Sequence, residues 1–327
     1  MAKMNFDDGV YVYDEKPHPV VVAQYAIENN DFALMRELIE KGDISLKPDE
    51  DGNSFLHHAA ASASAEMIQL LVAMGGDMYA LNENGQTPYE VAMTSGNEDG
   101  FKGFLASKID RNAVGTTQKT LPYDVAAYGN WQMMETYLAE TKTPADFVDS
   151  KGYSLLHEAC KHGNINTIRT LIQKGADVNV VDDVLSTPLH YLCAYNYQTT
   201  KRRLGVETLI QLGVDVNAQN EQGLTALHLA AHVGSSAVAK QLIKEGADIN
   251  VVDKKGKTAL DYVNARLATA NQESEQYQEL KSLQEALISA GGKQSSSIHA
   301  TLGQAGKAIH NQKDTIADVV RGENKER

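Results

Sequence analysis

The feature that most constrains this chain is a short block of sequence that recurs about every 33 residues. The copies are SFLHHAA (54–60), TPYEVAM (87–93), LPYDVAA (121–127), SLLHEAC (154–160), TPLHYLC (187–193), TALHLAA (225–231) and TALDYVN (258–264). Their starts differ by 33, 34, 33, 33, 38 and 33 residues, and VVAQYAI (21–27) is a weaker first copy. A fixed period of this length predicts a stack of small, similar units, because each unit buries its apolar face only against its neighbours.

Each copy has the signals of a helix start. Pro88, Pro122 and Pro188 suit the first helical turn, where a missing backbone N–H costs nothing. A Ser or Thr just before the helix can supply an N-cap oxygen. A second stretch then shows apolar residues at helical spacing, as at 165–172, so each unit is predicted to be a helix pair. The copy at 121 can slip by one residue, because Gly129 arrives one position early.

The quoted blocks resemble the T-P-L-H-x-A signature of the ankyrin-repeat family. GADVN (175–179), GVDVN (213–217) and GADIN (246–250) follow three of them at the same offset. The resemblance runs from about residue 17 to 291 and implies an all-α fold. That fold is an ankyrin-repeat solenoid of about seven to eight helix-turn-helix units with β-hairpin turns.

This resemblance divides the chain into three expected parts. A lead-in of 1–16 precedes an ankyrin-repeat domain of 17–291, and a tail of 292–327 combines a linker with an amphipathic helix. The tail is alternatively without stable structure by itself, given its glycines and polarity. Within the domain the repeats match weakly at 17–48 and 96–148 and strongly at 149–260, and 261–291 is expected to be a polar C-terminal cap.

Two departures from the repeat stand out. The 38-residue spacing between the copies at 187 and 225 adds five residues, which we expect to expand the helix-to-helix turn at 195–205. Leu185 also replaces a turn glycine of the other strong units, so its turn is expected to differ in geometry. A cluster of glycines at 96–103 weakens one helix and predicts either a hinge at 96–119 or a rigid, irregular loop.

Two H-x-x-C pairs, at 157–160 and 190–193, have the ligand count of a zinc site. Both pairs nevertheless fill ordinary repeat positions, and equivalent positions of stacked helices should lie about 8–10 Å apart, too far to share one ion. No phosphate-binding glycine loop and no complete catalytic constellation occurs. We therefore expect no cofactor, no metal and no enzymatic activity, and we expect the repeat histidines to brace turns by hydrogen bonds.

Asn179, Asn217 and Asn250 fall in a pattern that resembles the asparagine-hydroxylation pattern seen in ankyrin repeats. The alternative is that these asparagines shape the turns, because that pattern overlaps the consensus of the fold.

Composition limits the classes of partner. The 327 residues carry a formal net charge of −13, which argues against nucleic-acid binding. The N-terminal sequence MAKMNFDDGV lacks the apolar core of a signal peptide, and no apolar run suits membrane insertion. Two cysteines cannot form a disulfide framework, which indicates a reducing compartment. The expected location is cytoplasmic, or a host cytosol if the protein is a delivered effector.

The family resemblance implies partner binding through hairpin tips and the exposed side of the first helices. Interface hot spots are enriched in Tyr, Trp and Arg. The partner-binding residues predicted on this basis, called here the predicted patch, are Tyr153, Lys161, His162, Asp183, Tyr195, Tyr197, Arg202, Arg203, Glu221, Leu224 and His232. Truncating Tyr153 and Tyr195 together is expected to weaken binding by about 2 kcal/mol or more, unless these tyrosines merely cap helix ends.

These observations favour a non-catalytic protein-protein interaction module that is monomeric when unbound and binds a protein partner through its concave face and hairpin tips. The same surface could serve a cytosolic adaptor, an inhibitor or immunity-type protein, or a secreted microbial effector with the tail as an address. An enzyme is the rival class, and it would need a pocket with convergent polar groups.

Overall fold

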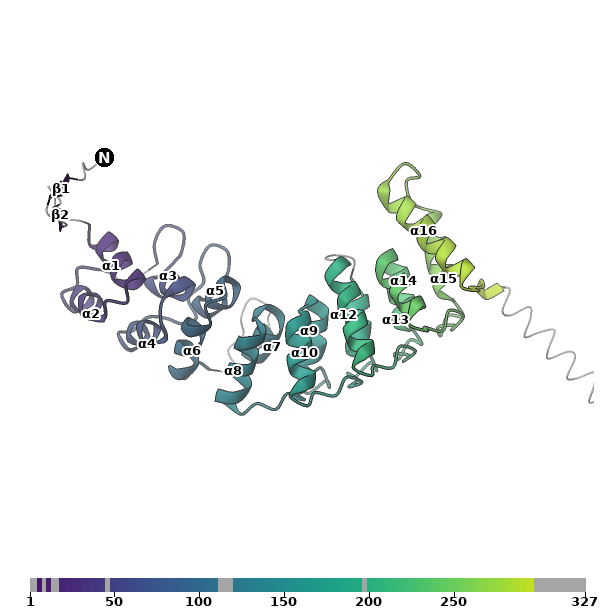
Figure 1. Ribbon diagram of the computed structural model, residues 1–327, viewed down its shortest axis with the longest axis horizontal. Helices are drawn as coiled ribbons and strands as arrows, with labels where there is room; N and C mark the ends of the chain where they lie inside the picture. Colours follow the sequence, from purple (N-terminus) through teal and green to yellow (C-terminus); the bar gives the residue numbers. More distant parts are fainter. Residues whose placement is uncertain are drawn as a thin grey trace, which may run out of the picture. The chain divides into compact units, whose positions relative to one another are not determined.

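The computed structural model describes residues 5–7, 10–12, 18–44, 48–110, 120–195 and 199–296 (Figure 1). Helices dominate these residues, as the repeat pattern predicts. Two short strands near the N-terminus, β1 (Asn5–Asp7) and β2 (Val10–Val12), pair antiparallel. The chain forms two compact units, the first from Met1–Phe147 with Asn166–Ala176 and the second from Val148–Ile165 with Asp177–Arg327.

The first unit is built from successive helix pairs whose first members pack on one another, as do the second members. Its helices are α1 (Pro19–Glu28), α2 (Phe32–Glu40), α3 (Phe55–Ser62), α4 (Ala65–Ala73), α5 (Pro88–Ser95), α6 (Glu98–Ala106), α7 (Leu121–Tyr128), α8 (Trp131–Thr141) and most of α10 (Ile165–Gln173). Small buried residues such as Ala59, Ala60 and Ala92 let the first helices approach closely.

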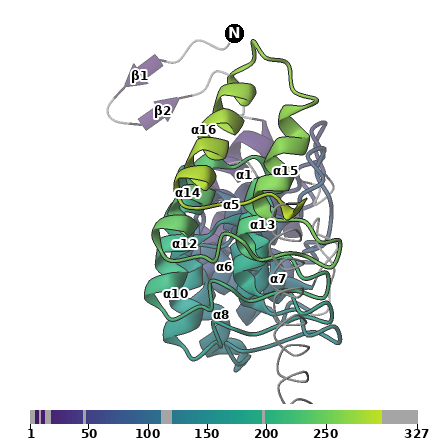
Figure 2. The same ribbon diagram turned by 90° about the vertical axis from the view of Figure 1, so that its right-hand side faces the viewer.

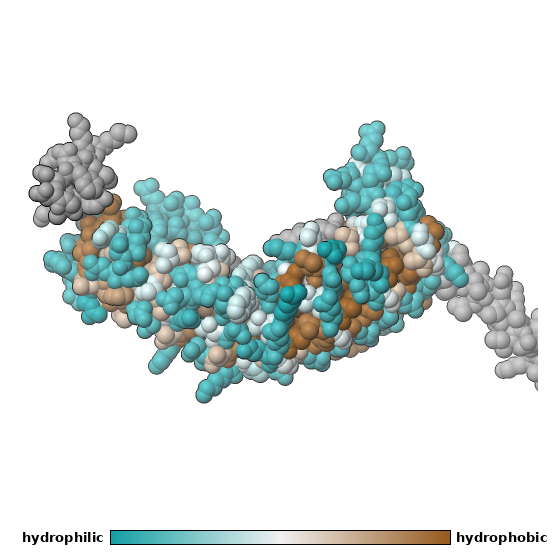
Figure 3. Space-filling model, viewed as in Figure 1, coloured by the Kyte–Doolittle hydropathy of each residue, from teal (hydrophilic) through white to brown (hydrophobic). Residues whose placement is uncertain are grey.

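The second unit repeats this arrangement. Its helices are α9 (Leu155–His162), α11 (Pro188–Cys193), α12 (Thr199–Gln211), α13 (Ala226–Val233), α14 (Ser236–Lys244), α15 (Ala259–Leu267) and α16 (Glu275–Ser289). Figure 2 shows α12, α14 and α16 stacked as one row, with α13 and α15 beside them. Polar residues cover the α15–α16 turn and the start of α16 (Figure 3).

Capping chemistry sets where the first helices begin. Ser54, Thr87, Ser154, Thr187, Thr225 and Thr258 each form a capping box with the third helical residue. Helix α7 begins after Thr120 and reaches Gly129 nine residues later, the same interval that separates Thr87 from Gly96. This repeat therefore starts at Thr120 and not at Leu121, which is the shift by one residue that the position of Gly129 indicated.

The five additional residues do not simply expand a turn. Helix α12 has 13 residues, against 9 in α14, and it already begins at Thr199. The expectation of an expanded turn across 195–205 is therefore wrong for its second half, because 199–205 is helical and lengthens α12. Residues 196–198, which include Tyr197, lie outside the described residues.

The expectation about Leu185 is also wrong. Its φ of 58° falls in the left-handed region, beside the 71° of Gly152 and the 75° of Gly223. The Leu185 N–H donates to the carbonyl of Asp182 at 3.0 Å, as the Gly152 N–H does to Asp149. The hydrogen bonds of the loop thus impose the glycine geometry on a leucine, which carries local strain.

The glycines of α6 have a packing role. A Cβ at Gly103 would lie 2.6 Å from the carbonyl oxygen of Ala65 and 2.7 Å from Cβ of Ile68, both in α4. Glycine therefore permits a close approach of two helices within the first unit. Residues 111–119 of the suggested hinge, and residues 297–327 of the tail, lie outside the described part of the chain.

Candidate partner-binding site

Four loops of the second unit follow one pattern. Each opens with an Asp or Asn whose side-chain oxygen accepts hydrogen bonds from the backbone N–H groups two and four residues later. For Asp149 the donors are Lys151 and Tyr153, at 2.8 and 3.0 Å. Asp182, Asn220 and Asp253 accept equivalent bonds of 2.8 to 3.1 Å. The opening side chain thus shapes each loop locally.

Backbone hydrogen bonds join these loops edge to edge. At each junction a tip N–H donates to a carbonyl of the preceding tip: Asp183 to Lys151 at 2.7 Å, Glu221 to Val184 at 2.8 Å and Lys254 to Gln222 at 2.9 Å. We call residues 149–153, 182–186, 220–224 and 253–257 the loop ladder. Because every tip is held both internally and by its neighbour, its side chains are presented at a defined spacing.

A histidine from each of four first helices ties its own loop to the next one. His157 Nδ1 accepts from the Ser154 N–H at 3.0 Å, so its Nε2–H donates to the carbonyl of Ser186 at 2.9 Å. His57, His190 and His228 make the corresponding bonds to carbonyls 2.9 to 3.1 Å away. Burial lowers the pKa of these last three imidazoles. The expected bracing role is confirmed.

The predicted patch divides into different environments. Exposed members are Asp183, Glu221 and His232, and half-buried members are Lys161, His162, Tyr195, Arg203 and Leu224. Tyr153 is only 8% exposed and Arg202 is 0% exposed. This burial corrects the expectation that the side chains of Tyr153 and Arg202 project outward, and the partner-binding role of the other members stays a prediction.

Tyr153 is buried because its ring packs between two others. It stacks on His157 and meets the ring of Tyr191 edge-on, with centroids 5.1 Å apart in both cases. The Tyr153 hydroxyl donates to Glu158 Oε2 at 2.8 Å, and Glu158 Oε1 lies 3.1 Å from His162 Nε2. Burial and the Glu158 carboxylate raise the pKa of Tyr153 far above its ordinary value. Truncating Tyr153 would therefore disturb this cluster as well as any binding.

Arg202 completes two helix ends. Its Nη1 donates to the carbonyl of Leu192 in α11 and its Nη2 to that of Lys161 in α9, both at 2.6 Å. The guanidinium carbon lies 5.3 Å from the ring centroid of Tyr195. The last carbonyls of a helix lack partners within it and carry the negative end of its dipole, so a cation is favourable there. The sequence pattern contained no signal for this inward orientation.

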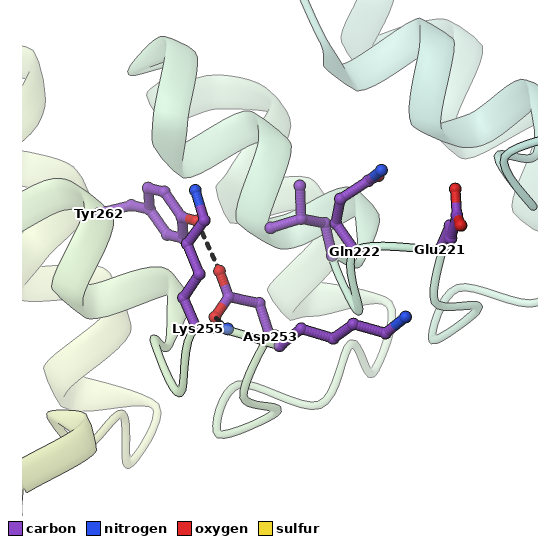
Figure 4. A pocket seen from close by; sticks show the side chains of 7 residues that line it. Glu221, Gln222, Asp253, Lys255 and Tyr262 are labelled. Atoms are coloured by element: carbon purple, nitrogen blue, oxygen red, sulfur yellow. Dashed lines mark hydrogen bonds between the residues drawn. The ribbon is translucent and has the colours of Figure 1, made fainter.

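A groove of about 330 Å³ opens along the loop ladder (Figure 4). Its lining is Glu221, Gln222, Leu224, Asp253, Lys254, Lys255 and Tyr262. The Tyr262 hydroxyl donates to Asp253 Oδ2 at 2.6 Å, and burial together with this carboxylate raises the pKa of Tyr262 to about 12. Sequence reasoning selected Glu221 and Leu224 but missed Tyr262, although its position in α15 matches that of Tyr191 in α11.

The cysteines offer no nucleophile. Cys160 and Cys193 are both free and buried. Burial raises the pKa of Cys160, and it raises the pKa of Cys193 to about 12, so neither forms a thiolate near neutral pH. Within the described ranges no group of three or more His, Cys, Asp or Glu side chains could hold a metal ion.

The three asparagines bridge successive turns. Asn179 Oδ1 accepts from the N–H of Asp215 at 2.8 Å, and Asn217 Oδ1 accepts from that of Asp248 at the same distance. Asn250 does the same for Lys293. These bonds support the structural interpretation of the asparagines.

Comparison with known proteins agrees with this architecture. The family description "Ankyrin repeats (3 copies)" matches residues 23–114 and 123–205, and "Ankyrin repeats (many copies)" matches 209–263. The chain belongs to the ankyrin-repeat family, whose repeats are generally protein-interaction modules and are not themselves catalytic.

Similar curated proteins share only part of their length with this chain. Rabankyrin-5 of Mus musculus is 31% identical over 143 residues, which is 43% of this chain and 12% of that protein. Synphilin-1 of Mus musculus is 29% identical over 163 residues, or 44% of this chain and 17% of that protein. A transient receptor potential cation channel subfamily A member 1 homolog of Caenorhabditis elegans is 31% identical over 141 residues, which is 42% of this chain and 11% of that protein. No helix among the described residues has the length and apolar composition to cross a membrane.

Proposed function

We propose that this chain is a non-catalytic module that binds a partner protein through the loop ladder and the adjoining exposed side of α9, α11 and α13. The observation that carries the proposal is the chain of backbone hydrogen bonds that joins four loop tips into one edge. A prearranged surface binds with a smaller loss of conformational entropy than separate mobile loops would.

The proposal includes the finer details of the array. The helix pairs α1–α2 to α15–α16 would correspond to eight repeats within a domain of 17–291. The free protein would be a monomer that works in a reducing, cytosolic compartment and does not bind nucleic acid. The two buried free thiols support the reducing compartment.

The exposed part of the predicted patch would make the contacts. Asp183, Glu221 and His232 are exposed, and Tyr195, Leu224 and Arg203 are half-buried. Tyr153 and Arg202 would contribute by holding this surface in place. Mixed charge at the loop tips would select a partner of complementary charge and raise its association rate.

Photo-crosslinking in cells that express the protein would test this proposal. A crosslinking residue at Asp183, Glu221 or His232 is expected to yield a covalent adduct with one partner protein. A crosslinking residue at Lys244 of α14, whose side chain is 74% exposed, is the matched control and should not yield that adduct. Adducts formed from Lys244 but from none of the loop positions would contradict the proposed surface.

A further inference from the structure

The second unit contains the same arrangement of aromatic rings, called here the aromatic frame, at two places: a first around Tyr191 and a second around Tyr262. Tyr191 and Tyr262 are each the fourth residue after the N-cap of a first helix, and each meets a repeat histidine edge-on. The ring centroids are 5.3 Å apart for His157 and Tyr191 and 6.0 Å apart for His228 and Tyr262. Each hydroxyl donates to the aspartate that opens the loop before its helix: Tyr191 to Asp182 at 2.7 Å and Tyr262 to Asp253 at 2.6 Å.

The residue that faces this frame differs between the two places. It is Tyr153 in one loop and Leu224 in the other, and each immediately precedes an N-cap. The Tyr153 N–H donates to Asp149 Oδ1 and the Leu224 N–H to Asn220 Oδ1, both at 3.0 Å. The two side chains therefore start from equivalent backbone positions.

The chain fills the first place with its own ring. Tyr153 stacks on His157 with an interplanar angle of 21° and meets Tyr191 at 81°. At the second place Leu224 is smaller and lacks a ring, and the groove of about 330 Å³ remains open beside Tyr262. Figure 4 shows Tyr262 on one side of this space and the loop bearing Glu221 and Gln222 on the other. A volume of this size lies at the lower end of the range of about 300–1,000 Å³ that ligand pockets span, and it is large enough for a side chain.

The groove mouth carries charges of both signs. The Asp253 carboxylate already accepts hydrogen bonds from the Tyr262 hydroxyl and from the N–H groups of Lys255 and Lys257. The side chains of Lys254 and Lys255 are exposed at the mouth, opposed there by Glu221. Two lysine ammonium groups favour carboxylates in the segment that enters.

We propose that this groove binds an aromatic side chain of a partner peptide whose neighbouring residues are acidic. The partner's ring occupies, beside Tyr262, the place that Tyr153 occupies beside Tyr191. The inference rests on the proposed function, because it names the kind of segment that the loop ladder binds.

The substitution Leu224→Tyr tests this directly, because it supplies at the second place the ring that the chain carries at the first. Binding of the labelled peptides Asp-Asp-Phe-Asp-Asp and Asp-Asp-Ala-Asp-Asp to the full chain would be measured by fluorescence anisotropy. We expect the phenylalanine peptide to bind at least about tenfold more tightly than the alanine peptide. Leu224→Tyr is expected to abolish that difference while keeping the thermal stability of the parent.

Two further variants complete the experiment. Leu224→Val keeps the groove open and should keep the preference for the phenylalanine peptide, whereas Lys254→Ala with Lys255→Ala should weaken binding of both peptides and reduce its salt dependence. Equal affinity for the two peptides, no saturable binding, or an unchanged preference in Leu224→Tyr would overturn the inference. If crosslinks from Asp183 and His232 to a partner persist in any of these cases, the proposed function stands without the aromatic site.

Discussion

The guanidinium of Arg202 donates a 2.6 Å hydrogen bond to the backbone carbonyl of Lys161, 41 residues earlier in the chain. The same group donates to Leu192, so one fully buried cation satisfies the C-terminal ends of α9 and α11. The residues that lengthen α12 thus place a structural side chain beneath the proposed binding surface, directly against the half-buried ring of Tyr195.

Arg202→Met is expected to lower the free energy of unfolding by about 3 kcal/mol, because methionine leaves the buried carbonyl of Leu192 and the part-buried carbonyl of Lys161 without their charged donor. Urea unfolding followed by circular dichroism would measure the loss. Arg203→Met is the matched control, since the Arg203–Glu207 ion pair is partly exposed at 3.7 Å and should contribute less than about 0.5 kcal/mol. Equal effects of the two substitutions would contradict the assigned role of Arg202.

Leu185→Gly is expected to stabilise the protein by up to about 1 kcal/mol. A left-handed conformation costs a residue with a Cβ about 1–2 kcal/mol, and glycine removes this cost. The greater conformational freedom of glycine in the unfolded chain offsets part of the resulting gain in stability. Thermal unfolding would show the midpoint rise. The same change at neighbouring Val184, which is not among the positive-φ residues, should lower the midpoint instead. A fall with Leu185→Gly would mean that the leucine is not strained.

Gly103→Ala tests whether glycine is present in α6 for its close packing against α4 or only lowers the helix propensity of α6. If glycine merely weakens α6, alanine should stabilise it by about 1 kcal/mol through helix propensity. We expect the opposite sign, a loss of about 1–3 kcal/mol, because the new methyl would overlap Ala65 and Ile68. Chemical denaturation of this variant and of Lys102→Ala, an exposed neighbour that should change little, would settle the sign.

Acid should destabilise the array through its repeat histidines. The folded-state pKa values of His57, His190 and His228 are lowered by burial, so below an unfolded value of about 6.5 the unfolded chain binds more protons than the folded one. Their contribution is therefore present above that pH and is lost as the pH falls. The free energy of unfolding should decrease from pH 7 to pH 5.

His228→Gln offers a control for this pH dependence, because an amide keeps one donor and one acceptor but does not titrate in this range. The decrease between pH 7 and pH 5 should be smaller in the variant than in the parent protein. An identical decrease would assign the acid sensitivity to other groups.

The helix pairs could be predicted because their signals are local and repeated. A Ser or Thr N-cap, a proline in the first turn, helical apolar spacing and a closing glycine each act within a few residues. Repetition of the same pattern along the chain then indicated the family. The histidines were predicted correctly for the same reason, since each binds the N-cap three residues before it.

The candidate site was predictable only in part. The tips of the loop ladder follow from repeat positions, which is how Glu221 and Leu224 were found. The groove beside Leu224 could not be predicted, because its size depends on whether Leu224 or a tyrosine faces the ring of Tyr262 in the next helix pair. Contacts of this kind join residues that are more than 30 positions apart.

By itself the sequence determined the repeat period, the helix starts and the family, because short-range capping and periodic burial dictate them. Only the tertiary structure decided that Arg202 and Tyr153 point inward, that Leu185 adopts a glycine conformation, and that a groove opens at Leu224. The physical reason is that no local pattern specifies the contacts on which these outcomes depend. They are the carbonyls of Leu192 and Lys161 for Arg202, the ring of Tyr191 for Tyr153, the hydrogen bonds within its own loop for Leu185, and the neighbouring Tyr262 for the groove.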